Sequence, residues 1–199
     1  MRKIFFVAVM SATFSVLVFF QLSCTGEGND KPKTQQEMVA LGKYIVSTSG
    51  CDDCHTPKIF TEAGPVFDTT KSLSGHQQSE SLPPLDISAL GQNQWAATTM
   101  SLTAWVGPWG ISYASNLTPD KATGIGTLTE EMFIKTMREG KYMGVGRPLL
   151  PPMPWQVYGM KTDEDLKAIY AYLMSIKPIS NLVPQPTPPD KAGEVLAKK

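Results

Sequence analysis

Residues that usually carry catalytic or metal chemistry are scarce in this sequence. Three cysteines and two histidines occur among 199 residues, and no Ser/His/Asp set can be assembled from them. Lysine plus arginine and aspartate plus glutamate each number 18, so no basic excess favours a nucleic-acid partner. Neither Gly124-Ile125-Gly126 nor Gly144-Val145-Gly146 has the third glycine of a dinucleotide-binding fingerprint. Alternating polar and apolar residues are also missing, so the sequence predicts a mostly α fold.

The N-terminus has the pattern of an export signal. Met1-Arg2-Lys3 is basic, and residues 4–20 form a run of seventeen residues without a charge. A basic segment followed by an apolar segment of this length is typical of a secretory signal peptide. The alternative is an uncleaved anchor, although seventeen residues are at the short limit of what spans a bilayer.

The residues that follow predict lipid attachment. In Gln21-Leu22-Ser23-Cys24 a small residue stands directly before a cysteine, which resembles the cleavage site of bacterial lipoproteins. We therefore predict a signal peptide at 1–23, a lipidated Cys24 and a flexible polar tether at 24–34. The mature chain would have the size of one domain. It would be exported and lipid-anchored to a membrane, on the periplasmic side or at the cell envelope.

The two remaining cysteines form the most specific motif of the chain. They stand in Cys51-Asp52-Asp53-Cys54-His55, and C-x-x-C-H is the attachment signature of c-type haem. Two thiols on one helical turn can form thioethers with the two vinyl groups of haem, and His55 would then lie beneath the iron as an axial ligand. The motif occurs once, so the sequence predicts one haem c bound through Cys51 and Cys54.

A cysteine pair at this spacing has two other interpretations. A thioredoxin-like dithiol expects a preceding strand and a βαβ sheet, which the sequence does not indicate. A structural zinc site needs four ligands, and His76 is the other imidazole of the chain. Export also favours haem, because c-type attachment in bacteria takes place outside the cytoplasm.

Three segments have apolar residues at helical spacing and recognisable ends. Residues 34–47 run directly toward the C-x-x-C-H motif, and residues 129–139 stop at a glycine. The third segment begins at the N-cap Thr162, has acidic residues in its first turn and stops at Pro178. The apolar residues of these segments are Met38, Leu41, Gly42, Ile45, Val46, Met132, Phe133, Met137, Leu166, Ile169, Tyr170, Leu173 and Met174.

The order of helix, C-x-x-C-H motif, proline-flanked methionine and final helix resembles the single-haem class I cytochromes c. In that family the first and last helices cross near the haem, with a small residue on one and an aromatic residue on the other, and Gly42 and Tyr172 match those positions. The resemblance implies a cytochrome c domain at 35–184. Residues 115–120, 123–126 and 153–155 resemble the cytochrome subunits that accept electrons from periplasmic dehydrogenases.

The second axial ligand is a methionine, His76 or no residue at all. Outside the signal peptide, the helical stripes and the unpatterned stretch around Met100, the candidate methionines are Met143, Met153 and Met160. Met153 alone stands between prolines, which hold a loop in extended geometry and leave it little entropy to lose. We therefore predict Met153 as the ligand and His76 as an ordinary loop histidine. The alternative for Met153 is a packed surface strap.

Met153 lies 98 positions after His55, a longer separation than a compact cytochrome needs. We interpret residues 61–112 as a loop-rich insertion that wraps the haem edge. Its tryptophans are expected to close a small core, the alternative being a docking surface. Five prolines occur from Pro178 to Pro189, so this stretch is interpreted as extended and closely packed only at its start. Residues 185–199 are interpreted as a proline-rich, charged tail.

Indole and guanidinium donors suit the carboxylates of haem propionates. The candidates in the sequence are Trp109, Arg147 and Trp155. By the family resemblance, Asn116 would hydrogen-bond near the haem, but it is equally suited to initiate the turn before Thr118-Pro119.

These features predict a one-electron carrier rather than an enzyme, either alone or as the cytochrome subunit of an oxidoreductase. The iron would cycle between two oxidation states with both axial ligands bound, and a dehydrogenase, an oxidase or another cytochrome would be the redox partner. A haem-based sensor or ligand-binding protein with an open distal site is the alternative. Met153 distinguishes the two, because a carrier needs both axial positions filled.

Overall fold

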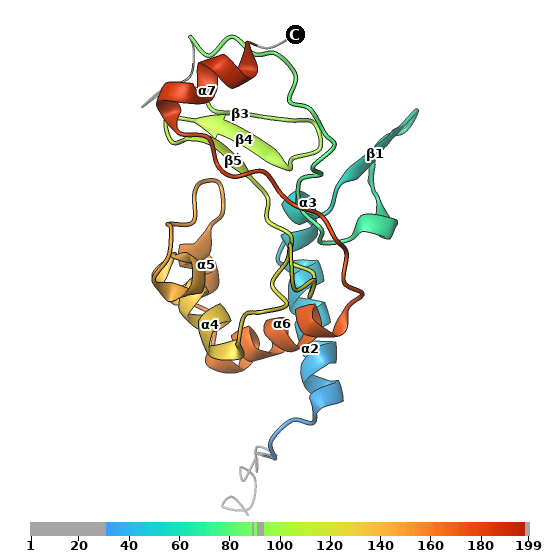
Figure 1. Cartoon of the computed structure of the whole chain (residues 1–199). Helices are drawn as coiled ribbons and strands as arrows, with labels where there is room; N and C mark the ends of the chain where they lie inside the picture. The colour runs from blue at the N-terminus through green and yellow to red at the C-terminus, as the bar shows by residue number, and fades with distance from the viewer. Residues whose placement is uncertain (1–30, 89, 91–93, 198–199) are drawn as a thin grey trace, which may run out of the picture. The chain divides into compact units, whose positions relative to one another are not determined.

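The computed structural model describes residues 31–88, 90 and 94–197, and residues Thr34–Lys199 form one compact unit (Figure 1). The predicted signal peptide, Cys24 and most of the tether lie outside the described residues. Among those described, no helix has the length and apolar character needed to cross a membrane. The helices are α2 (Gln35–Thr48), α3 (Cys51–His55), α4 (Glu130–Glu139), α5 (Trp155–Gly159), α6 (Asp163–Ser175) and α7 (Pro189–Leu196), with the 3-10 helices η2 (Thr69–Lys71) and η3 (Tyr142–Gly144).

The three helices that the sequence predicts are present, and local signals set their ends. Thr34 and Thr162 form capping boxes at the start of α2 and α6, because each hydroxyl accepts from the backbone three residues on and an acidic side chain bonds back. Thr129 caps α4, and Gly140 ends it in the left-handed conformation that glycine adopts without strain. These caps fix where the helical faces begin and end.

Helix α2 packs closely against α6 because one residue at their contact has no side chain. A Cβ atom at Gly42 would lie 1.8 Å from the Ala168 carbonyl oxygen and 2.8 Å from the Tyr172 Cβ. Around this contact the apolar faces of α2, α4 and α6 form the larger core of the molecule. Its buried members are Ile45, Val46, Leu73, Ile125, Leu128, Phe133, Leu166, Ala168, Ile169 and Leu173.

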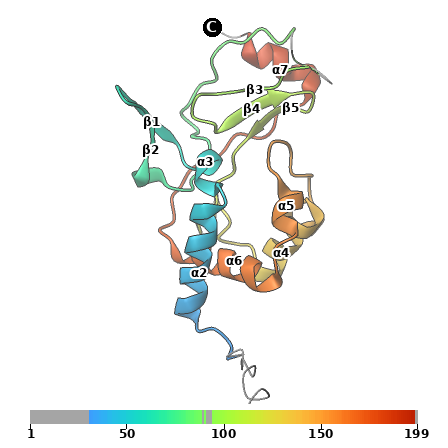
Figure 2. The ribbon, with the colours of Figure 1, turned by 180° about the vertical axis from the view of Figure 1, so that it is seen from behind.

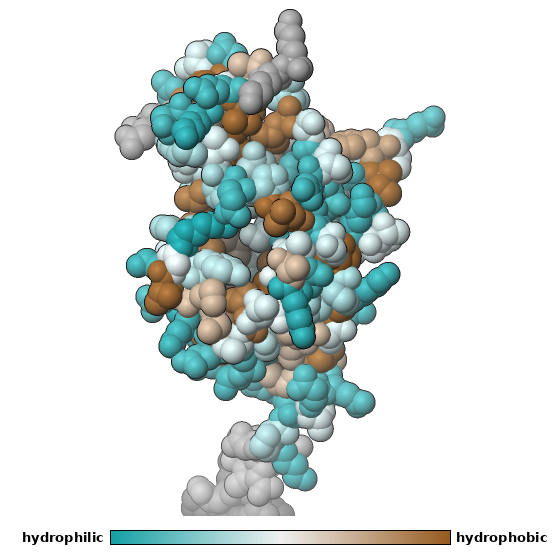
Figure 3. All heavy atoms as spheres, in the orientation of Figure 1, coloured by the Kyte–Doolittle hydropathy of each residue, from teal (hydrophilic) through white to brown (hydrophobic). Residues whose placement is uncertain are grey.

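The described residues also form five short strands that the sequence does not predict. Strands β1 (Lys58–Thr61) and β2 (Gly64–Phe67) form an antiparallel hairpin, and β3 (Ala97–Thr98), β4 (Ala104–Gly107) and β5 (Gly110–Tyr113) form an antiparallel sheet. Each strand has two to four residues, which is too short for an alternating pattern to be recognised. The apolar side chains of the hairpin, Ile59, Phe60, Val66 and Phe67, are between 44% and 57% exposed. Figure 3 shows hydrophobic atoms along this hairpin and a hydrophilic tip.

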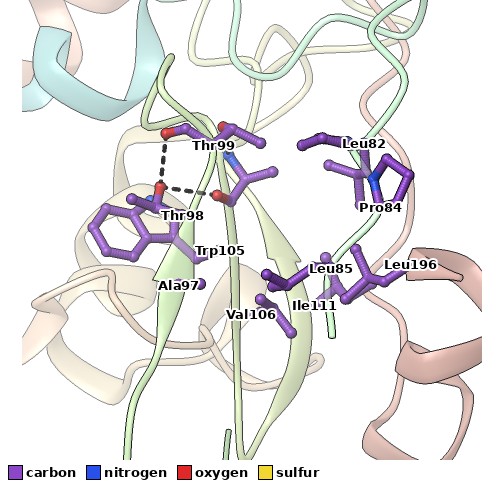
Figure 4. Close-up of a pocket in the computed structure, with 12 residues that line it drawn as sticks. Leu82, Pro84, Leu85, Ala97, Thr98, Thr99, Trp105, Val106, Ile111 and Leu196 are labelled. Atoms are coloured by element: carbon purple, nitrogen blue, oxygen red, sulfur yellow. Dashed lines mark hydrogen bonds between the residues drawn. The ribbon is translucent and has the colours of Figure 1, made fainter. Parts of the chain in front are cut away.

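The insertion is more ordered than the sequence indicates, because it has a small core of its own. Val106 and Ile111 of the sheet pack with Ala192 and Leu196 of α7, and both ribbon views place α7 over the sheet (Figures 1 and 2). Tryptophans do not form this core as expected, since it contains none among the described residues and Trp95 is 75% exposed. A small cavity of about 90 Å³ separates the sheet from residues 82–85 (Figure 4). Trp105 lines this cavity beside the core.

Between α6 and Pro189 the chain forms no helix, in line with the expected extended stretch, but the expectation of a loosely packed tail beyond it is wrong. Residue Thr187 pairs with Ile111 through two backbone hydrogen bonds of 2.8 and 2.9 Å, and α7 follows directly. The chain therefore returns from α6 along the edge of β5 and closes the second core.

Candidate functional site

A cavity of about 440 Å³ lies between the haem motif, α4, β5 and the loop before α5, and it has the size of a small-molecule site. Cys51, Cys54, His55 and Met153 all line it. Helices α3 and α5 stand apart in both ribbon views (Figures 1 and 2). The apolar part of the wall includes Val46, Leu117, Ile125, Leu128, Phe133, Leu166, Ile169 and Leu173. A largely apolar cavity with two thiols, an imidazole and a thioether fits a haem c.

A sharp turn aims the haem motif at this cavity. Gly50 has φ +76°, a left-handed conformation that lets the chain leave α2 and enter the five-residue helix α3 at once. In α3 the two cysteines are three positions apart and therefore share a face. Thr56 ends the helix, donating to the Asp52 carboxylate at 2.7 Å and accepting from the Leu73 backbone at 2.9 Å.

The imidazole of His55 has a partner that fixes its tautomer. Its Nδ1 lies 2.7 Å from the Ser115 carbonyl oxygen, which can only accept, so Nδ1 carries the proton. Nε2 is then left with the lone pair that a metal requires. Desolvation by burial lowers the pKa of His55, with the Ser115 bond opposing the shift. The ring is therefore neutral at pH 7 and suited to bind iron.

The carbonyl that holds His55 is itself fixed by a buried network around Asn116. The Asn116 Oδ1 accepts from the Thr118 backbone at 3.0 Å and from its hydroxyl at 2.7 Å, and Nδ2 donates to the Ile179 carbonyl at 2.8 Å. Asn116 thus acts as a turn initiator, and it does not line the cavity. Its neighbour Ser115 does line it.

Burial raises the pKa of both Cys51 and Cys54. A thioredoxin-like pair needs the opposite, a lowered thiol pKa, so these thiols are poor candidates for dithiol redox chemistry. Their neighbour Tyr158 is not predicted from the sequence; its hydroxyl lies 4.0 Å from the Cys51 Sγ and donates to the Ser49 carbonyl at 2.5 Å. Tyr158 joins α5 to the turn that carries the haem motif.

The structure separates the three candidate methionines. Met153 lines the cavity, whereas Met143 packs against the larger core and Met160 is 84% exposed. Met137 of α4, which the sequence places on a helical stripe, also lines the cavity. His76 does not, because it is buried with Nδ1 2.9 Å from the Thr103 hydroxyl and its ring against Tyr113.

The three predicted propionate partners have different surroundings. Arg147 lines the cavity and is exposed, with a hydrogen bond of 3.4 Å to the Pro148 carbonyl. Trp109 and Trp155 are not part of the cavity wall. The Trp109 Nε1 donates to the Ser112 hydroxyl at 3.2 Å, and the Trp155 ring packs on Gly140, where a Cβ would lie 2.3 Å from it. Across residues 31–88, 90 and 94–197, no three or more His, Cys, Asp or Glu side chains gather as a metal site.

Comparison with known proteins links the chain to cytochrome subunits of dehydrogenases, although no family model matches it. It is 45% identical over 73 residues to the fructose dehydrogenase cytochrome subunit of Gluconobacter japonicus, and 46% identical over 67 residues to the gluconate 2-dehydrogenase cytochrome c subunit of Pantoea cypripedii. These matches cover 36% and 34% of this chain. Over 178 residues, 89% of this chain, it is 28% identical to the cytochrome c subunit of the quinone alcohol dehydrogenase of Gluconacetobacter polyoxogenes.

The aligned segments are 15% of the length of the first two relatives and 30% of the third. The homologues of this chain are thus much longer proteins, named as cytochrome subunits of dehydrogenases. The comparison therefore confirms one part of the prediction from sequence, the resemblance to cytochrome subunits of dehydrogenases.

Proposed function

We propose that this protein carries single electrons through one haem c, bound covalently by Cys51 and Cys54 and ligated by His55 and Met153. The observation that carries the proposal is the shared cavity, because residues 98 positions apart in the sequence line one apolar space of suitable volume. The haem would supply the one-electron change of its iron. The protein would hold the neutral His55 ring through Ser115 and exclude water with its apolar wall.

We further infer that the helical part has the cytochrome c fold. The close contact of α2 with α6 at Gly42 and Tyr172 supports this inference, since the family has a small and an aromatic residue at that crossing. The electron donor would be a dehydrogenase, as the names of the relatives suggest. The lipid anchor at Cys24 rests on the sequence alone, and a wild-type protein that takes up no labelled palmitate would rule it out.

The test of attachment is whether haem stays on the denatured chain. Thioethers survive acid-acetone extraction and denaturing electrophoresis, so haem staining should follow the wild-type band. The double variant Cys51→Ala, Cys54→Ala should have no stained band. A double variant that keeps covalent haem would refute the site.

The test of ligation uses the weak near-infrared band of methionine-ligated ferric haem. Met153→Leu should abolish the band, and Met153→His should also lower the reduction potential, because a thioether favours ferrous iron more than imidazole does. Met137→Leu, Met143→Leu and Met160→Leu are matched controls that should keep the band. If one of these controls loses it while Met153→Leu keeps it, the ligand is wrong; if the wild type has no band, the open-site sensor gains support.

A further inference from the structure

The insertion contacts the loop of Met153 through one serine. Ser112 of β5 is 7% exposed, and its hydroxyl donates to the Pro151 carbonyl at 2.5 Å, the short end of the range for O–H···O bonds. Its oxygen accepts from the Trp109 Nε1 at 3.2 Å. Ser112, Pro151 and Met153 all line the cavity. The hydrogen bond therefore acts two residues before the candidate ligand.

The loop has few other means of being held from outside. We call residues 149–154 the strap; three of its six residues are prolines, which have no backbone N–H to donate. Its N–H groups donate from Leu149 to the Gly140 carbonyl at 2.8 Å and, in a local turn, from Met153 to Leu150 at 3.2 Å. At its end, the Met153 and Pro154 carbonyls accept from the first turn of α5, at 2.9 to 3.3 Å. Among the described residues, Ser112 provides the one side-chain hydrogen bond that reaches the strap from another element.

Ser112 is well suited to hold the strap because its own position is fixed on two sides. It pairs with Trp105 of β4, and the preceding Ile111 is bonded to Thr187 in both directions. Trp109 is fixed as well, since its ring covers Gly107, where a Cβ would lie 2.6 Å from it. The strap is thus attached to a sheet, which moves less than a loop.

We propose that Ser112 is a positioning residue for Met153, and that the insertion serves to hold the axial ligand in place. This inference rests on the proposed function, in which the Met153 sulfur binds the iron. Without the Ser112 bond, the strap would move away more often, and an external ligand would reach the iron more easily.

The experiment is a titration of the ferric holoprotein with imidazole, followed by loss of the near-infrared band. Imidazole binds only where Met153 has left the iron, so its apparent affinity reports the open fraction of the strap. Ser112→Ala removes one hydrogen bond and should raise the imidazole affinity about fivefold. Ser112→Thr keeps the hydroxyl and should have the wild-type affinity. Thr98→Ala, in the same sheet but outside the wall of the cavity that contains Met153, should leave the imidazole affinity unchanged.

The outcomes distinguish a failure of the positioning role of Ser112 from a failure of the proposed function. A wild type without the band overturns both, whereas a wild type with the band and an unchanged affinity in Ser112→Ala overturns the positioning role alone. A loss of global stability in Ser112→Ala with no change in imidazole affinity also overturns it. Should Ser112→Ala fail to fold, Trp109→Phe removes the donor to Ser112 and should raise the affinity about twofold, and no rise would refute the proposal.

Discussion

At the scale of single residues, His76 shows how an imidazole outside the proposed site can make the folding stability depend on pH. Its side chain is buried, Nε2 has no hydrogen-bond partner among the described residues, and Glu80 lies 3.8 Å from Nδ1. Desolvation by burial lowers its pKa below the ordinary 6.5, and the Glu80 carboxylate opposes the shift. The folded protein therefore holds the neutral ring more firmly than the unfolded chain does.

We expect His76 to make the protein less stable in mild acid. Below pH 6.5 the unfolded state binds a proton that the folded state rejects, so stability falls as the pH drops from 6.5 toward the lowered folded pKa. His76→Gln should lose less stability than the wild type between about pH 7.5 and about pH 5.5, measured by urea unfolding. Glu80→Gln should lose more, and equal losses in all three proteins would contradict the assignment.

At the scale of elements, the sequence predicts those helices whose ends and apolar faces are set by residues close together in the chain. The three long helices were predictable because Thr34, Thr129 and Thr162 are local caps and the apolar stripes recur within each segment. Helix α7 was missed because its prolines were interpreted as extended chain, although Pro189 is at its first position, where proline is favoured. The strands were missed because their pairing is set by partners rather than by pattern.

The same distinction holds for the site. Cys51, Cys54 and His55 form a local motif, whereas Tyr158 and Ser112 act on residues 107 and 39 positions away, and no local signal marks them. Trp109 was proposed for a propionate because a free indole donor suits one, but here a serine on the next strand accepts its hydrogen bond. Contacts between segments that are distant in the sequence can be identified only once the fold is known.

We expect Gly42→Ala to separate α2 from α6. The new Cβ would overlap the Ala168 carbonyl oxygen at 1.8 Å, which backbone atoms cannot avoid without moving a helix. Overpacking of this kind costs about 3 kcal/mol, or about 6–12 °C in Tm for a protein of this size. Gly193→Ala in α7 is the control, because its Cβ would be 3.2 Å from the flexible Ile87 Cδ1. Equal Tm values for the two variants would contradict this account of the contact.

At the scale of the whole molecule, two cores share one chain. The larger one belongs to α2, α4 and α6, and the smaller one joins the insertion to residues 187–196. Asn181 joins the insertion to the segment after α6, since its side chain donates to the Ser74 and His76 carbonyls at 2.8 Å each. The sheet of the insertion is therefore packed around a second core, although Leu73 of the insertion belongs to the larger one.

We expect Leu196→Ala to loosen the smaller core selectively. Leu196 is buried against the sheet, and such truncations cost about 2–5 kcal/mol. Hydrogen exchange should become faster in β4 and β5 while α2 and α6 stay protected, because local units can open separately. Leu182→Ala, at a site that is 54% exposed, should change neither. Equal acceleration in α2 would show that the two cores unfold together.

The pairing of Ile111 with Thr187 also affects the order in which the parts of the proposed site are completed. Haem attachment would take place outside the cytoplasm, so the order that counts is that of export, in which His55 precedes Thr187 by 132 positions. The proposed attachment cysteines and His55 would thus be exported first, whereas the sheet that contacts the strap lacks its edge partner until residue 187 is present. We expect newly made chains to pass through a stage with haem attached and Met153 not yet held. A chain ended at residue 186 should stay at that stage, with covalent haem and a weakened near-infrared band, and a full-strength band would exclude it.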